Sequence, residues 1–123
     1  MGDDSSLTQA LLAEIVFTFI LCFVILCMAT NSEVENNHYY GLAIGLVVAS
    51  GAISVGPIGG GAFNPAVALG LSVASGVSNL LYAILVSASN LIGGIIAAVC
   101  FRLVLPGEFD VVGTGGETIP LRA

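Results

Sequence analysis

The chain has 123 residues, of which 57% are hydrophobic and only 8% are charged, and its mean hydropathy is +1.07. These values are typical of an integral membrane protein and exclude an ordinary soluble domain of this length. The net charge is −6 with only two basic residues, so the sequence predicts neither nucleic-acid binding nor attraction to anionic lipid headgroups.

Three apolar segments are predicted to span the lipid bilayer, after a polar leader at residues 1–9 and before a polar tail at residues 106–123. The expected spans are residues 10–30, 39–55 and 80–105. The first span is not a cleavable signal peptide, because it lacks a basic leader and a small-residue cleavage site, and its apolar core is too long. We therefore expect a multi-pass protein of the plasma membrane or of an organellar, inner or thylakoid-type membrane, which the sequence does not distinguish.

A glycine-rich run between the second and third spans leads into Asn64-Pro65-Ala66. Asparagine is a preferred helix N-cap and proline a preferred first helical residue. The apolar stretch 65–73 that follows spans roughly 14 Å, about half of a hydrocarbon core of about 30 Å. The sequence thus predicts an all-α membrane protein with three transmembrane helices and one re-entrant half-helix, whose dipole-positive N-terminus presents N–H donors near the midplane.

Small residues recur at four-residue spacing on two of the spans, and such faces let helix backbones approach closely in lipid. The second span carries Gly41, Gly45 and Ala49, and the third carries Ser89, Gly93 and Ala97. We expect both stripes to pack within one helical bundle rather than to act as a specific dimerisation motif.

Glu14 is the one carboxylate inside a predicted span, and a carboxylate there costs perhaps 2.5–3.5 kcal/mol at the bilayer centre. It is either a proton-relay residue or an acceptor for N–H groups of a non-helical loop, which must be satisfied inside the protein. The glycine-rich loop favours the second interpretation. Asn79 and Asn90 are likewise interpreted as residues that hydrogen-bond between helices rather than bind ligands.

The two basic residues, Arg102 and Arg122, both lie toward the C-terminus. Since basic residues concentrate on the cytoplasmic side of membranes, they favour a C-terminus that faces the cytoplasm or its equivalent. The sequence contains no metal-ligand set, only one histidine and no paired carboxylates in a span. We therefore expect no enzymatic activity, no metal and no cofactor.

Three short motifs together resemble a known family. Ala13-Glu14 lies in the first span, Leu-Ala-Ile-Gly begins at Leu42, and the loop reads Gly-Gly-Ala-Phe-Asn-Pro-Ala over residues 60–66. Eighteen residues separate the second motif from Asn-Pro-Ala, as in the second repeat of aquaporins and glycerol facilitators. Over about residues 10–105 the chain resembles one half of such a major intrinsic protein.

The resemblance implies that Asn64 donates its side-chain amide to a solute at the pore midpoint, with Pro65 and Ala66 fixing the start of the half-helix. It implies that carbonyls of residues 59–62 line the path and that Glu14 braces the loop. Water or small uncharged solutes would then pass passively.

The resemblance also exposes departures at the family's selectivity filter. Val67 stands where the second repeat of water channels has an arginine, Ala52 where it has a histidine, and Gly61 at the third filter position. Valine supplies neither hydrogen-bond donors nor a positive barrier to cations. The filter implied here is wide and apolar, and the valine matches the motif of a first repeat, so the chain mixes features of both halves.

A family channel has two inverted repeats, and this chain has one, which cannot enclose a pore. The resemblance therefore implies a partner besides the lipid bilayer: a second copy, another chain with the other half, or subunits of a larger membrane complex. The alternative to transport is a non-conducting structural accessory subunit of a large membrane protein complex.

Overall fold

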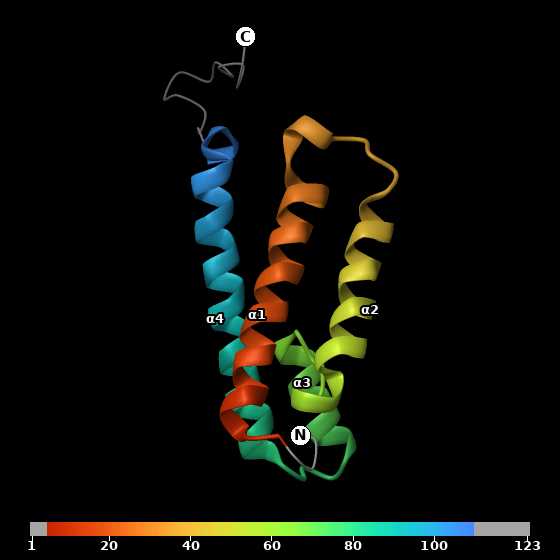
Figure 1. The fold of residues 1–123 in the computed structure, drawn as a ribbon, viewed down its shortest axis with the longest axis vertical. Coiled ribbons are helices and arrows are strands. Elements are labelled where there is room, and N and C mark those ends of the chain that lie inside the picture. Colours follow the sequence, from red (N-terminus) through yellow and green to blue (C-terminus); the bar gives the residue numbers. More distant parts are fainter. Residues whose placement is uncertain (1–4, 110–123) are drawn as a thin grey trace.

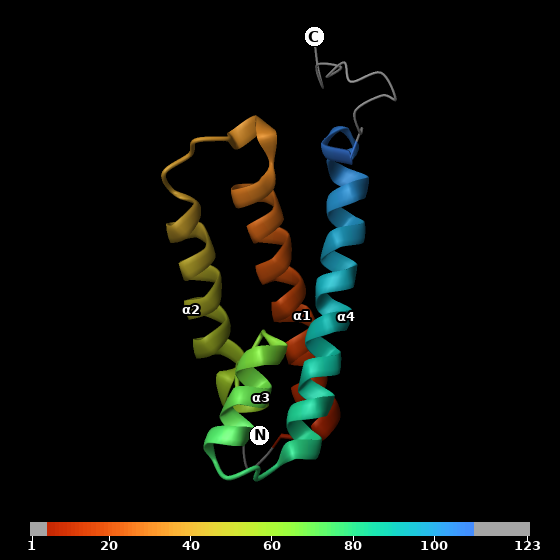
Figure 2. The ribbon, with the colours of Figure 1, turned by 180° about the vertical axis from the view of Figure 1, so that it is seen from behind.

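The computed structural model describes residues 5–109, and within that part of the chain all regular structure is helical (Figure 1). The helices, in chain order, are α1 Leu7–Ile25, its π-helical continuation η1 Leu26–Thr30, the 3-10 turn η2 Ser32–Val34, α2 Tyr40–Gly59, α3 Pro65–Ala74, α4 Leu80–Val104 and the 3-10 turn η3 Pro106–Phe109. Both ribbon views place the short helix α3 at one end of the molecule, beside the first half of α4 (Figures 1 and 2).

Three of these helices are long and apolar enough to cross a membrane: Leu7–Thr30, Tyr40–Gly59 and Leu80–Val104. Pro65–Ala74 has only 10 residues, too few to cross. The predicted fold class of an all-α, multi-pass membrane protein with three spans and one half-helix is confirmed.

The first helix begins three residues earlier than expected, because a capping box starts it. The Ser6 hydroxyl accepts the Gln9 backbone N–H at 3.2 Å, and the Gln9 side chain accepts the Ser6 backbone N–H at 2.9 Å. This arrangement satisfies two of the N–H groups that a helix start leaves free. Residues 7–9 of the expected leader are therefore helical, and residues 1–4 lie outside the described part.

The second helix extends four residues beyond its predicted end and contains Pro57. It ends where the backbone turns left-handed, at Gly60 with a φ of 98°, followed by Gly61 with a φ of 68°. The Gly60 N–H still bonds to the Gly56 carbonyl at 2.9 Å. Glycine reaches these left-handed conformations without steric cost, so α2 can end sharply at this point. The non-helical loop between α2 and α3 is therefore short and comprises residues 60–64.

The two stripes of small residues have opposite environments. On α4, Ser89, Gly93 and Ala97 are buried, as expected, and a Cβ added at Gly93 would lie 2.5 Å from the Ile15 carbonyl oxygen of α1. On α2, the stripe is exposed, and a Cβ added at Gly41 or Gly45 would meet no atom within 4 Å. The expectation that the α2 stripe packs within this bundle is wrong for the described residues, because α2 contacts α1 through a different face.

That other face of α2 contains Gly51 and Gly59. A Cβ added at Gly51 would lie 2.7 Å from the Phe17 ring, and one added at Gly59 would lie 3.1 Å from the Ala10 carbonyl oxygen. These close approaches position the end of α2, and hence the loop that follows it, against α1.

The polar tail expected from Pro106 onward begins with the 3-10 turn η3. Arg102 lies in the last turn of α4. Residues 110–123 of the tail, including Arg122, lie outside the described part of the chain.

Candidate functional site

The start of α3 has the predicted cap. Asn64 is extended, with φ −156° and ψ 127°, and its Oδ1 accepts the Ala66 backbone N–H at 2.9 Å. Pro65 occupies the first helical position, and the Asn64 carbonyl accepts the Ala68 N–H at 3.1 Å. Because Oδ1 is used in capping, the amide nitrogen of Asn64 is the side-chain group that can donate outward.

Glu14 lies on α1, directly against the loop that precedes α3, and its side chain is fully buried, with 0% exposure. Its Oε1 accepts the Ala62 N–H and its Oε2 accepts the Phe63 N–H, each at 2.9 Å. One carboxylate thus satisfies two consecutive N–H groups that no helix or sheet pairs. These contacts are those that the structural interpretation of Glu14 requires.

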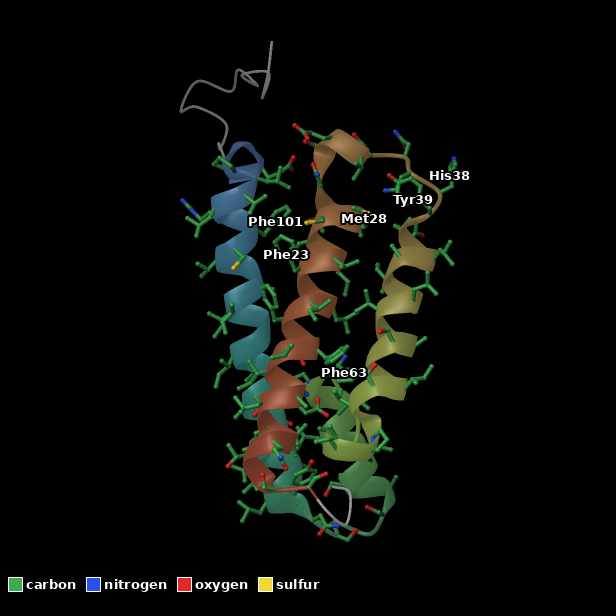
Figure 3. The ribbon with its side chains drawn as sticks, in the orientation of Figure 1. Phe23, Met28, His38, Tyr39, Phe63 and Phe101 are labelled. Carbon is green, nitrogen blue, oxygen red and sulfur yellow. The ribbon has the colours of Figure 1, made fainter. Side chains whose placement is uncertain are left out.

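Phe63 adopts a left-handed backbone with a φ of 47°, which is uncommon for a residue with a side chain. Its N–H is held by Glu14, and its buried ring lies between α1 and α2 (Figure 3), 5.6 Å from the Phe17 ring centroid and against Gly51. Such a conformation persists only where surrounding contacts determine it. The strained turn at Phe63 leads the chain from the loop that follows α2 into the start of α3.

Asn90 on α4 joins α1 to the start of α3. With its amide oxygen facing Asn64, it accepts the Asn64 backbone N–H at 3.0 Å. Its nitrogen then donates to Glu14 Oε2 at 3.0 Å and to Thr18 Oγ1 at 2.9 Å. Asn90 therefore makes the interhelical hydrogen bonds expected of it, and in addition fixes the capping residue of the half-helix.

Asn79, also expected to bond between helices, instead precedes α4 as an exposed residue with a φ of 59° and makes no side-chain cap. A contact that the sequence reasoning missed comes from Tyr82, three residues later, whose hydroxyl donates to the Gly59 carbonyl at 2.6 Å. A tyrosine in an apolar span needs an acceptor for its hydroxyl, so the sequence signals such a hydrogen bond but not its partner. The Gly59 carbonyl is consequently engaged by α4.

The residues predicted at the constriction lie on surface that this chain leaves open. Asn64, Ala66 and Ala52 are exposed, and Val67 is 43% exposed. Gly61 lies beside Ala52, since a Cβ added at Gly61 would be 3.7 Å from the Ala52 Cα atom. On one side, the loop and the start of α3 are hydrogen-bonded to α1 and α4. On the other side, no part of residues 5–109 covers them.

The chemistry available on the open side is hydrogen bonding and apolar contact. No group of three or more histidine, cysteine, aspartate or glutamate residues within the described part could hold a metal ion. What the open side offers is the Asn64 amide at a capped helix N-terminus, beside small or apolar side chains.

The chain is similar in sequence to known proteins. The family model described as Major intrinsic protein matches residues 2–117. The chain is 41% identical over 73 residues to "Probable aquaporin NIP4-2" of Arabidopsis thaliana, covering 59% of this chain and 25% of that protein. It is 35% identical over 99 residues to "Aquaporin-8" of Rattus norvegicus, and the match covers 80% of this chain and 36% of that protein.

"Aquaporin A" of Dictyostelium discoideum is 33% identical over 115 residues, which cover 92% of this chain and 40% of that protein. The chain therefore spans between a quarter and two fifths of the length of these relatives. No solved structure gives a significant match.

Proposed function

The chain belongs to the major intrinsic protein family, and we propose that it forms one half of a membrane channel for water or small uncharged solutes. Members of this family are channels rather than enzymes. The half-repeat would comprise residues 10–105, flanked by polar segments at 1–9 and 106–123. The observation that carries the proposal is the capped start of α3. The backbone of Asn64 is hydrogen-bonded to Asn90 of α4, while the residue itself is exposed.

The arrangement of hydrogen bonds supports a conducting role for Asn64. The N–H groups of residues 62, 63 and 64 all bond to side chains of α1 and α4. The loop is therefore fixed without using the Asn64 amide nitrogen, which is free to donate to a solute. Since Tyr82 engages the Gly59 carbonyl, the acceptors that we assign to the path are the carbonyls of residues 60–62.

A complementary half is part of the proposal, whichever polypeptide carries it. Loop backbone at membrane depth is tolerated only where protein covers it or where it lines a water-filled cavity. The exposed residues around the loop would then lie between the two halves, with Asn64, Pro65 and Ala66 at the pore midpoint. Ala52, Gly61 and Val67 would form the constriction, which their small or apolar side chains leave wide and without a fixed positive charge.

Reconstitution tests this function. The chain, purified with whatever co-migrates from the native membrane, is placed in liposomes, and shrinkage is followed by light scattering after an osmotic or glycerol step. We expect faster shrinkage than in lipid alone, and an Asn64→Leu variant should lose most of this flux. Loss of the cap itself costs typically about 1 kcal/mol, so the variant should still fold and assemble.

Asn31→Leu is the matched control, because Asn31 also caps a helical turn, accepting the Glu33 N–H at 2.9 Å, but lies in the connection between α1 and α2. Its flux should equal that of the wild type. Equal flux in wild type and Asn64→Leu would remove Asn64 from any conducting role. An assembled wild type without flux would favour the non-conducting accessory subunit instead.

A further inference from the structure

A contact that we call the clasp joins the connection between α1 and α2 to the end of α4. Glu108 Oε1 accepts both the backbone N–H of Ser32, at 3.1 Å, and the Ser32 hydroxyl, at 2.6 Å. The two residues are 76 positions apart in the sequence. The clasp thus depends on a hydroxyl proton donated by Ser32 to a carboxylate.

Ser32 is exposed and borders a cavity of about 280 Å³ lined by Ser32, Glu33 and residues 104–108. The hydroxyl therefore has open space beside it, so a phosphoryl group attached there would meet the Glu108 charge rather than packed atoms. Two exposed carboxylates follow Ser32, at Glu33 and Glu35. These carboxylates lie one and three residues after the serine. A kinase with arginine and lysine side chains in its peptide-binding groove could pair with both of them.

The membrane orientation fits such a modification. The clasp lies at the same end of the molecule as the C-terminal end of α4 (Figure 1), whose last turn contains Arg102. A basic residue at the end of a span favours the cytoplasmic side, where ATP and protein kinases are found.

We propose that Ser32 is phosphorylated by an acidophilic, ATP-dependent serine kinase and that this modification opens the clasp. Ser32 Oγ forms a bond to the γ-phosphorus of ATP, the bond from that phosphorus to the β–γ bridging oxygen breaks, and ADP leaves. The hydroxyl proton passes to the kinase's base. The product carries a charge of about −1.5 to −2 at neutral pH. It has lost the hydroxyl donor and repels the Glu108 carboxylate.

The test uses the full chain in lipid nanodiscs, incubated with Mg·ATP and an acidophilic serine kinase. Peptide mass spectrometry locates the phosphoryl group, and hydrogen exchange reports the backbone amides of the connection and of α1 and α4. We expect modification at Ser32 and faster exchange of the Ser32 amide, with α1 and α4 unchanged. Ser32→Ala should abolish the modification, and Glu35→Gln should slow it several-fold.

Glu108→Gln separates charge repulsion from simple loss of a contact. Its neutral oxygen can still accept the Ser32 hydroxyl, so the unmodified variant should resemble the wild type, while phosphorylation should accelerate amide exchange much less. A folded protein that is modified only at other serines would overturn the proposal. So would a phosphorylated Ser32 whose amide exchanges at the unmodified rate.

Discussion

The stripes of small residues on α2 and α4 have the same four-residue spacing and opposite environments. Gly93 lies so close to α1 that an added Cβ would be 2.5 Å from a backbone oxygen, whereas an added Cβ at Gly45 would meet nothing within 4 Å. In lipid, small residues permit close packing, and no hydrophobic effect drives helices together. The spacing therefore predicts that a helix can approach closely but not which helix does so.

The same contrast divides the whole molecule into two sides. The packed side holds the α1–α4 contact together with the buried hydrogen bonds of Glu14 and Asn90. The open side holds the α2 stripe and the front of the loop, including Asn64 and Val67. We assign the packed side to the stability of the single chain, and we propose that the open side contacts a complementary half and solute.

The largest expected effect is on the packed side, from Glu14→Leu. It leaves the Ala62 and Phe63 N–H groups without their acceptor, and each buried unsatisfied group costs about 1–3 kcal/mol. We expect a loss of about 2–6 kcal/mol in the free energy of unfolding, by the same estimate, measured by denaturant titration in detergent.

The matched control for this change is Glu35→Leu, which removes an exposed carboxylate from the connection between α1 and α2 and should leave the stability almost unchanged. Equal stability of Glu14→Leu and the control would contradict the assignment of Glu14 to the loop.

The next effect compares the stripes directly, through Gly93→Val and Gly45→Val. At Gly93 the side chain would collide with the backbone of α1, and overpacking costs typically about 1–3 kcal/mol. At Gly45 the side chain has open space, so the purified single chain should change by no more than about 0.5 kcal/mol.

Thermal unfolding of the two glycine variants in the same detergent measures this difference. In the native membrane the order of effects should change, since Gly45→Val is expected to weaken association with the complementary half while the chain itself stays folded. If the two variants destabilise the purified chain equally, the two stripes do not differ in how closely they pack against other helices.

The smallest effect on the fold is expected from Val67→Arg, because Val67 is exposed on α3. If the pore forms as proposed, the arginine adds donors and a positive charge at the constriction, which should disfavour glycerol relative to water and oppose cation leak. The ratio of glycerol to water flux in liposomes checks this. An assembled, conducting variant with an unchanged ratio would show that Val67 does not line the path.

If Val67 instead packs against a partner, an unpaired arginine would be costly to bury and would break association. Gel filtration of the solubilised native assembly distinguishes this outcome from a change in selectivity, because the partner would no longer co-migrate with the chain.

Local sequence features predicted the spans and the half-helix well, because hydropathy, Asn64 as a cap and Pro65 at the first position act over a few residues. The end of α2 was harder to place. Gly56 and Pro57 are typical of loops, yet the helix continues through them until the left-handed Gly60.

The rest of the site depends on which helices meet. No local pattern indicates that Tyr82 reaches the Gly59 carbonyl or that Asn90 reaches the Asn64 N–H, because these pairs form only once α4 packs beside the loop. The burial of the α4 stripe and the exposure of the α2 stripe are likewise a consequence of tertiary packing.

The most direct test of the two-sided account is photo-crosslinking in the native membrane. A photoreactive leucine analogue replaces Leu42, which is 67% exposed and lies next to Gly41 of the open α2 stripe, or, as the control, Leu103 on α4, which is 75% exposed. We expect the probe at Leu42 to couple to a polypeptide segment carrying a second Asn-Pro-Ala repeat, while the probe at Leu103 couples mainly to lipid. Coupling of the Leu42 probe to lipid alone, or to a polypeptide without such a repeat, would contradict this.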